Sequence, residues 1–432
     1  MRSLSVRTVP AVVLLVLLSI SLGCGGRTTG TPDQASSPSV SPVPPRIYLP
    51  GVSSEGGATA PSPLPAPTGE PQGETEVPQT PTPTPLPPPV PKPGYGVQLH
   101  IPPRWEMEPT LRWAQGLGVG WIKEQVQWHT IEHGPDDFDW QNLDRVVEGA
   151  HRAGFNILLG VTRAPDWTRA VEMDGGPPTD YAQFGRFMEQ LAGRYRGRVR
   201  AYELWNEPNL VREWRGDTLD AAHFASLVAE GARGVRAADP DAIVVSGAPA
   251  VTGIDDGETA VDDRAFLRGM LEAGIERHVD AIGAHPYGYA NPPAESWEDE
   301  THVATSHNDH PSFFFRDTLE DYRQIMLDYG VEGHQIWVTE FGWPSPQGIG
   351  EMDLTGWEYG SQVTEAQQAD YVVRAFHMGD ERPWVGPMFL WNLNLATIWG
   401  SENTFSAYSL LRPDGSYRPA YVALRLAAPL EP

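Results

Sequence analysis

The sequence VRAYELWNEP, residues 199–208, is an apolar, strand-like run, Val199–Trp205, with a glutamate, Glu207, just beyond its end. The same design recurs in QIWVTEFG, residues 335–342, where Glu340 follows the strand candidate Gln335–Thr339. Each run would therefore deliver a carboxylate to the end of a strand.

Six further segments have the same strand-like texture, and they alternate with helix-like segments from Tyr95 onwards. They are Tyr95–His100, Trp121–Val126, Asn156–Val161, Ala242–Ser246, Ala281–His285 and Pro387–Trp391. Eight strands alternating with helices predict an α/β fold, namely a closed (β/α)8 barrel (TIM barrel). An open doubly wound sheet is the alternative, but the first strand lacks the Gly-rich phosphate loop typical of that fold.

The segments between the strands show the periodicity of helices with one buried stripe. Apolar residues recur at helical spacing in residues 143–150 and 184–191, and less fully in residues 319–326. The final segment, Tyr417–Leu426, is long enough to cover the last strand. The sequence shows no internal repeat, so we expect residues 95–432 to form a single folded domain.

The first 94 residues have a different composition. Residues 25–94 consist mainly of Pro, Thr, Ser and Gly, which cannot bury enough apolar surface to offset the entropy lost on ordering. We therefore expect a disordered linker, which would serve as a stalk for the folded domain or as a simple tether.

Residues 1–24 are typical of a signal peptide. Arg2 and Arg7 precede the apolar run Ala11–Leu18, and small residues lead to Cys24, the one cysteine of the chain. The ending resembles a bacterial lipobox, which implies a lipid anchor on Cys24, although Ser21 replaces the usual leucine. The alternative is an ordinary secretory signal. In either case the expected location is extracellular or in the cell envelope.

Charge and aromatic content narrow the possible partners. The formal net charge is −25, from 56 acidic and 31 basic side chains, and such a surface repels the phosphates of nucleic acids. The 15 tryptophans suit stacking against sugar rings, but they are equally typical of core packing. We therefore expect no nucleic-acid partner.

The two glutamates would meet in a barrel, because the C-terminal ends of all its strands open on one face. Glu207 would follow the fourth strand, and Glu340 the seventh. Two carboxylates across one pocket are the minimum needed to break a glycosidic bond, since one protonates the leaving oxygen and the other attacks or activates water. The alternative is that both are solvated residues at strand ends.

Around these glutamates the chain resembles clan A, the retaining glycoside hydrolases with (β/α)8 barrels, which include cellulases and β-xylosidases. The strings that carry the resemblance are Trp205–Asn209 and Thr339–Trp343, and the resemblance extends from Tyr95 to about Ala427. It implies that Glu340 attacks the anomeric carbon, while Glu207 is first the acid and then the base. The scheme implies no cofactor and no metal.

The resemblance also implies residues that bind the substrate. Asn206 would bind the sugar 2-hydroxyl, His285 and Tyr287 would line the pocket with the Tyr287 hydroxyl steadying the nucleophile, and Trp391 would lie beneath the sugar. His100 could contact a hydroxyl group. Each of them also has a purely structural interpretation, as a turn residue or as part of the core.

One position departs from the family pattern. The clan often places an arginine near the nucleophile after strand two, and this chain has Lys123 there. A lysine is a point charge without the fork of arginine, which leaves the positioning of Glu340 in question. Lys123 as a surface charge is the alternative. In the third loop, Arg163 and Trp167 could reach the sugar or brace the rim.

The longest insertion, residues 288–315, contains His302, His307 and His310 among acidic residues. Their spacing fits no established metal motif, so we expect a polar loop that covers the substrate. The sequence thus predicts a monomeric, retaining β-glycosidase that acts on poly- or oligosaccharides. The alternatives are a non-catalytic carbohydrate-binding barrel and a transglycosylase with the same two glutamates.

Overall fold

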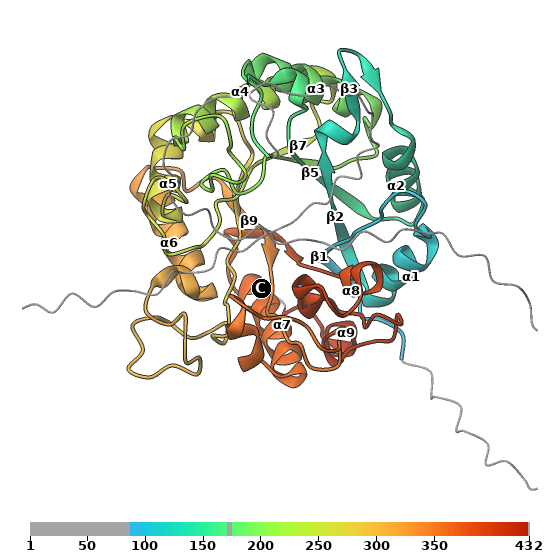
Figure 1. Ribbon diagram of the computed structural model, residues 1–432, viewed down its shortest axis with the longest axis vertical. Helices are drawn as coiled ribbons and strands as arrows, with labels where there is room; N and C mark the ends of the chain where they lie inside the picture. The colour runs from blue at the N-terminus through green and yellow to red at the C-terminus, as the bar shows by residue number, and fades with distance from the viewer. Residues whose placement is uncertain (1–86, 171–174, 431–432) are drawn as a thin grey trace, which may run out of the picture. The chain divides into compact units, whose positions relative to one another are not determined.

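The structure is a computed structural model that describes residues 87–170 and 175–430 (Figure 1). The predicted signal peptide, the anchor residue Cys24 and the linker as far as residue 86 lie outside the described residues. In the parts of the chain that are described, no helix has both the length and the apolar character needed to cross a membrane.

Eight parallel strands form a closed barrel in the order β1-β10-β9-β8-β7-β6-β5-β2, with β2 pairing with β1 again. They are β1 (Lys92–Gln98), β2 (Val119–Gln127), β5 (Asn156–Thr162), β6 (Ala201–Leu204), β7 (Ile243–Ser246), β8 (Ala281–Ala284), β9 (Gln335–Phe341) and β10 (Val385–Leu390). The predicted barrel is confirmed, and closure excludes the open sheet. β1 begins at Lys92, inside the stretch that the sequence assigned to the linker.

Helices surround the barrel, as the sequence predicted (Figure 1). They are α1 (Met107–Leu117), α2 (Gln141–Arg152), α3 (Tyr181–Arg194), α4 (Ala221–Ala238), α5 (Asp263–Glu272), α6 (Phe315–Asp328), α7 (Glu365–Asp380), α8 (Leu395–Trp399) and α9 (Pro419–Leu426). The periodic segments 143–150, 184–191 and 319–326 lie in α2, α3 and α6.

Short polar side chains fix the starts of several helices. Asp180, Asp220 and Asp262 accept hydrogen bonds from backbone N–H groups in the first turns of α3, α4 and α5. Thr364 and Gln367 form a reciprocal capping box at the start of α7. These acceptors satisfy N–H groups that have no partner inside the helix.

The lower part of the barrel is filled by apolar side chains. One layer takes one residue from each of seven strands: Trp121, Leu158, Ala201, Val245, Ala281, Trp337 and Phe389. Buried polar side chains replace this layer towards the C-terminal ends of the strands, among them Lys123 on β2 and Glu203 on β6. The barrel interior is thus apolar in one layer and lined by buried polar side chains nearer the C-terminal ends of the strands.

The first and last strands of the barrel close it. β1 pairs with β10 through Tyr95 opposite Met388. Beyond the strands, the Asn394 side chain donates to the His100 carbonyl (2.8 Å) and accepts from the His100 N–H (3.0 Å). The structure also contains a small hairpin, β3 (Glu132–Gly134) and β4 (Asp137–Phe138), which the sequence did not predict.

Candidate active site

The structure brings Glu207 and Glu340 together at one histidine. The Nδ1 atom of His285 lies 3.3 Å from Oε1 of Glu207 and 3.9 Å from Oε2 of Glu340. These two carboxylate oxygens are therefore no farther apart than the sum of the two distances. Both glutamate side chains are buried. Residues from the fourth and seventh barrel strands thus converge, as the sequence predicted.

A strained turn directs Glu207 into the barrel mouth. Both Trp205 (φ 80°) and Glu207 (φ 43°) have left-handed backbone conformations, which are uncommon for residues other than glycine. The Glu207 N–H donates to the carbonyl of Ala248 (3.0 Å). A Cβ atom on Gly247 would lie only 2.7 Å from the Trp205 carbonyl oxygen, so the close packing of this turn on the end of β7 requires a glycine.

Glu207 has a cationic partner that sequence reasoning missed. Arg212, in the loop after β6, donates from Nη2 to Oε2 of Glu207 at 2.7 Å. Burial by itself would raise the pKa of Glu207, but the hydrogen bond from His285 and the charge of Arg212 outweigh burial, and the pKa is lowered. Arg212 lies outside any family string that we recognised, so the sequence held no signal for it.

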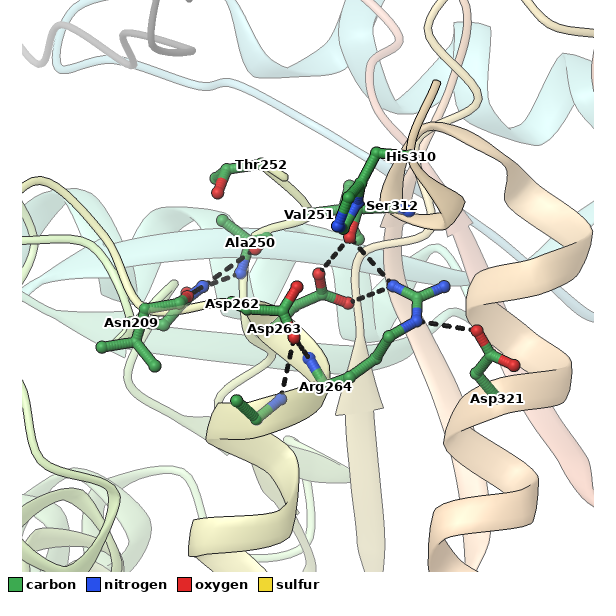
Figure 2. A network of polar contacts seen from close by, with 12 residues as sticks. Asn209, Ala250, Val251, Thr252, Asp262, Asp263, Arg264, His310, Ser312 and Asp321 are labelled. Atoms are coloured by element: carbon green, nitrogen blue, oxygen red, sulfur yellow. Dashed lines mark hydrogen bonds and ion pairs between the residues drawn. The ribbon is translucent and has the colours of Figure 1, made fainter. Parts of the chain in front are cut away.

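Two asparagines flank Glu207 with different surroundings. The side chain of Asn206 is buried, and neither its Nδ2 nor its Oδ1 atom has a hydrogen-bond partner among the described residues. Asn209 instead donates to the carbonyls of Ala250 (2.9 Å) and Val261 (2.8 Å) and accepts from the Ala250 N–H, a pairing visible in Figure 2. Asn209 ties the Glu207 loop to the next loop, whereas Asn206 has free polar atoms to offer a ligand.

Glu340 receives two donors. The Tyr287 hydroxyl donates to Oε2 (3.0 Å), and the Lys123 ammonium lies 3.2 Å from Oε1. Burial, together with the nearby charge of Glu340, raises the pKa of Tyr287 well above its ordinary value, so this hydroxyl keeps its proton and remains a donor. The contact between Tyr287 and Glu340 that the resemblance implied is therefore present.

Lys123 is buried in the barrel and is not a surface charge. Its Nζ atom lies 2.8 Å from Oε2 of Glu203 as well as 3.2 Å from Oε1 of Glu340, and all three side chains are 1% exposed. Burial alone would lower the pKa of Lys123, but the two carboxylates outweigh burial and raise it. Lys123 therefore stays cationic beside Glu340, where the clan often has an arginine.

Aromatic rings lie next to these groups. Trp391, just after β10, is buried and packs edge-on against Tyr287, with ring centroids 6.3 Å apart. Tyr408 and Phe405 also contact the Trp391 ring, at 5.1 and 5.5 Å between centroids. Trp391 thus lies beside the donor of Glu340, and its place beneath the sugar stays a prediction.

Two other predicted residues have different environments. His100 is tied through its backbone to Asn394, its ring lies 6.2 Å from that of Trp399, and burial together with Lys123 lowers its pKa to about 3. Trp167 donates to the carbonyl of Glu132 (3.3 Å) on the barrel rim. Among the described contacts none joins Trp167 to Glu207 or Glu340, and its substrate role stays a prediction.

Arg163 lies near the Arg212 loop. Burial raises the pKa of Glu213, and the charges of Arg212 and Arg163 oppose this rise. The backbone of Arg163 has a left-handed conformation (φ 59°), and its carbonyl accepts from the His129 N–H (3.0 Å).

The histidines of the insertion 288–315 have separate partners. His302 Nδ1 lies 3.1 Å from Glu295, the ring of His307 stacks on that of Tyr289 (5.0 Å), and His310 Nδ1 accepts from a backbone N–H. Over residues 87–170 and 175–430, no group of three or more His, Cys, Asp or Glu side chains is arranged to hold a metal ion.

A buried polar network fixes the end of this insertion, as Figure 2 shows. The Ser312 hydroxyl donates to Asp263 (2.5 Å), and the Arg264 guanidinium donates to both Ser312 (2.9 Å) and Asp263 (2.9 Å). Arg264 also pairs with Asp321 of α6 (2.7 Å). Helix α5 thus holds the end of the insertion, and it is paired in turn with α6.

Aromatic contacts connect the insertion to the candidate site. Tyr289 packs against Tyr359 (5.0 Å between centroids), and the hydroxyls of Tyr359 and Tyr408 lie 3.2 Å apart. Tyr408 in turn contacts Tyr287 and Trp391. The insertion is therefore part of the wall beside the site.

The chain was compared with known proteins. Residues 111–381 match the family model described as cellulase (glycosyl hydrolase family 5). No curated protein is significantly similar to the chain. Among solved structures, a family 39 glycoside hydrolase from Bacteroides cellulosilyticus WH2 is similar at 19% identity and TM-score 0.58, covering 77% of this chain and 63% of that one.

Two further structures have the same fold. A glucosidase from Croceicoccus marinus is 16% identical, with TM-score 0.55, and covers 78% of this chain and 68% of that one. A monomeric beta-xylosidase from Caulobacter crescentus CB15 is also 16% identical, with TM-score 0.55, covering 79% of this chain and 69% of that one. At these identities the likeness concerns the fold alone.

Proposed function

The chain belongs to the cellulase family, glycosyl hydrolase family 5, and from this premise we propose that it is a retaining glycoside hydrolase. It cleaves O-glycosidic bonds of the β configuration in poly- or oligosaccharides by double displacement. Glu340 is the nucleophile, and Glu207 is the acid and base. The observation that carries the proposal is the meeting of these two buried carboxylates at one nitrogen of His285.

The spacing of the pair supports retention. Retaining enzymes hold their carboxyl groups ~5–5.5 Å apart, whereas inverting enzymes leave ~6.5–9.5 Å for a water molecule. The sum of the two distances from His285 Nδ1, 3.3 Å to Glu207 and 3.9 Å to Glu340, is an upper limit on the separation of the nearest oxygens. This limit is compatible with the retaining spacing.

In the first step, the ionised Glu340 attacks the anomeric carbon, and a covalent glycosyl-enzyme forms as the leaving oxygen departs. Tyr287 and Lys123 hold the Glu340 carboxylate by its two oxygens, which fixes its direction of attack. The proton on Glu207 passes to the leaving oxygen. Asn206, whose polar atoms have no described protein partner, binds the 2-hydroxyl of the sugar.

In the second step, Glu207 takes a proton from water, and the resulting hydroxide displaces Glu340 from the sugar. The lowered pKa of Glu207 favours the ionised form that this step requires. Protonated Glu207, which the first step requires, is more abundant at acidic pH. We therefore expect the enzyme to work best on the acidic side of neutrality.

We also propose that the enzyme acts outside the cell. The charged and apolar segments before Cys24 support export and a lipid anchor, and the Pro-rich stretch that precedes β1 supports a spacer. Lipid analysis of the mature protein tests this proposal, because a Cys24→Ser variant should lose its membrane association and keep its activity.

The test of the catalytic proposal is a screen on aryl β-glycosides of xylose, glucose, mannose and galactose, and on β-glucan. Glu340→Gln should lower the hydrolysis rate by several orders of magnitude. Glu207→Ala should keep the first step for substrates with good leaving groups, and azide should restore turnover of the glycosyl-enzyme. Product anomers observed by NMR should keep the β configuration.

The same screen separates the alternatives. Sugar binding without hydrolysis, unchanged in Glu340→Gln, would indicate a carbohydrate-binding barrel. Transfer to an added acceptor sugar in preference to water would indicate a transglycosylase. Near-normal rates in Glu340→Gln would refute the nucleophile assignment.

A further inference from the structure

Lys123 bridges two carboxylates below the sugar site. Its Nζ atom lies 2.8 Å from Oε2 of Glu203 and 3.2 Å from Oε1 of Glu340, and it also donates to the Thr339 carbonyl (3.2 Å). The three charged side chains are 1% exposed. One cation is thus shared by the nucleophile and by a second carboxylate that the reaction scheme does not use.

The backbone is arranged to admit this bridge. β2 and β6 are both neighbours of β5, on which Gly160 is paired in register with Glu203. A Cβ atom at Gly160 would lie 3.0 Å from Oε2 of Glu203 and 3.2 Å from Cε of Lys123. The side chains of Lys123 and Glu203 therefore meet across β5 above a residue that has no side chain, and any larger residue would crowd both.

The charges around Glu340 can be named from each packed element. β2 supplies Lys123, the end of β8 supplies His285 and the loop after it Tyr287, and the β6 segment supplies Glu203 and Glu207. The loop after β6 adds Arg212, which contacts Glu207, and Glu213, whose charge interacts with that of Glu340. The closest cation is Lys123, because the His285 ring lies 3.9 Å from Glu340. Glu203 is the anion that competes most directly for that cation.

We propose that Glu203 is a positioning residue for the nucleophile, which divides the charge of Lys123 between itself and Glu340. The division has two consequences. It fixes the ammonium group below Oε1 of Glu340, and it prevents Lys123 from neutralising the attacking carboxylate too strongly. The inference rests on the proposed function for its catalytic consequence, but the electrostatic coupling exists whether or not the protein turns over a glycoside.

The contrasting interpretation is a buried ion pair that only stabilises the barrel. Such a pair contributes to the free energy of unfolding and leaves the reactivity of Glu340 unchanged. The two interpretations differ in what Glu203→Gln does. Glutamine has nearly the same shape and can still accept a hydrogen bond from Lys123, but it removes the competing charge.

The experiment is a pH titration by NMR of the full chain with ¹³C-carboxyl-labelled glutamate, in which the Glu340 signal is assigned from Glu340→Gln. In Glu203→Gln the titration of Glu340 should move to lower pH, because Lys123 then pairs with Glu340 alone. Glu203→Asp, which keeps the charge, should recover at least half of this shift. Equal effects of the two variants, or an unmoved titration in Glu203→Gln, would overturn the proposal.

Kinetics supply the second readout. The acidic limb of the kcat/KM profile on an aryl glycoside should move to lower pH with the titration, and single-turnover glycosylation should slow about tenfold. Glu132→Gln is the matched control, because Glu132 is also a buried carboxylate in an ion pair, with Arg186 on the rim. Glu132→Gln should alter the free energy of unfolding and leave the acidic limb of the kcat/KM profile unchanged.

The two proposals fail in different ways. If the unaltered protein hydrolyses no glycoside but the Glu340 titration responds to Glu203→Gln as expected, the proposed function fails and the coupling stands. If hydrolysis is normal, and Glu203→Gln changes neither the titration of Glu340 nor the acidic limb of the kcat/KM profile, the proposed coupling fails and the proposed function stands.

Discussion

A buried carboxylate keeps its charge only where donors and cations replace the water it has lost. Glu207 and Glu340 meet this requirement with different partners. Arg212 and His285 contact Glu207, whereas Lys123 and Tyr287 contact Glu340. Each partner can be altered separately, so the protonation of the acid and the direction of the nucleophile can be tested one at a time.

Arg212 should control the pH at which Glu207 can act as an acid. In Arg212→Met, burial is no longer opposed by the arginine, so the pKa of Glu207 should rise. The first step needs protonated Glu207. The basic limb of the kcat/KM profile should therefore move to higher pH, most visibly for aryl glycosides with poor leaving groups.

Arg215→Met is the matched control for this change. Arg215 is in the same loop, and its side chain makes no hydrogen bond or ion pair recorded for the described residues. The control should leave the basic limb where it is. A profile of Arg212→Met that coincides with that of the unaltered protein would show that Arg212 does not govern the protonation of Glu207.

At the scale of elements, the insertion 288–315 is held by polar side chains on neighbouring helices. Asp263 and Arg264 at the start of α5 contact Ser312 in the short 3-10 helix Pro311–Phe313. The same insertion contributes aromatic contacts that reach the site, such as Tyr289 with Tyr359. The insertion is therefore a fixed part of the wall, and its stability should depend on the network.

Ser312→Ala should destabilise the protein. The change removes a donor to the fully buried carboxylate of Asp263, and leaving such a group short of a partner costs about 1–3 kcal/mol. Urea unfolding measures the loss, and limited proteolysis should show faster cleavage within residues 288–315. Ser361→Ala, which removes an exposed hydroxyl bonded to the Glu358 carbonyl, should change stability by less than about 0.5 kcal/mol. Equal values for the two variants would mean that the network does not hold the insertion.

At the scale of the whole molecule, the barrel could be predicted from the sequence because most of its strands are largely apolar runs. Parallel strands that are buried on both faces have this composition. In the helices between them, apolar residues recur with the helical period of 3.6 residues. The order of the strands then follows from the right-handed crossovers of such units. The hairpin β3–β4 was not predicted, because strands of three and two residues show no periodic pattern.

The candidate site was partly accessible to the same reasoning. Glu207 and Glu340 stood at predicted strand ends, where the topology alone brings them to one face. Glu203 was missed although a signal existed, because a charged residue in the middle of a buried strand must find a partner. Arg212 could not have been found, since the conformation of its loop depends on tertiary contacts that no local pattern encodes.

The closing of the barrel by β1 and β10 has a consequence for how this protein is made. Tyr95 is paired with Met388, so one edge of the first strand stays open until β10 has been made. Such long-range pairing folds slowly and leaves strand edges exposed. On the ribosome, the polypeptide must therefore emerge beyond β10 before the barrel can close.

Truncation can mimic such a nascent chain. A protein that stops at Asp380 lacks β10, α8 and α9, and it should show weak near-UV circular dichroism and rapid digestion by protease. One that stops at Ala427 keeps all three and should resemble the full chain. A well-folded product ending at Asp380 would show that seven strands suffice. If seven strands do not suffice, a cell that makes this protein has to protect the incomplete barrel until β10 has been synthesised.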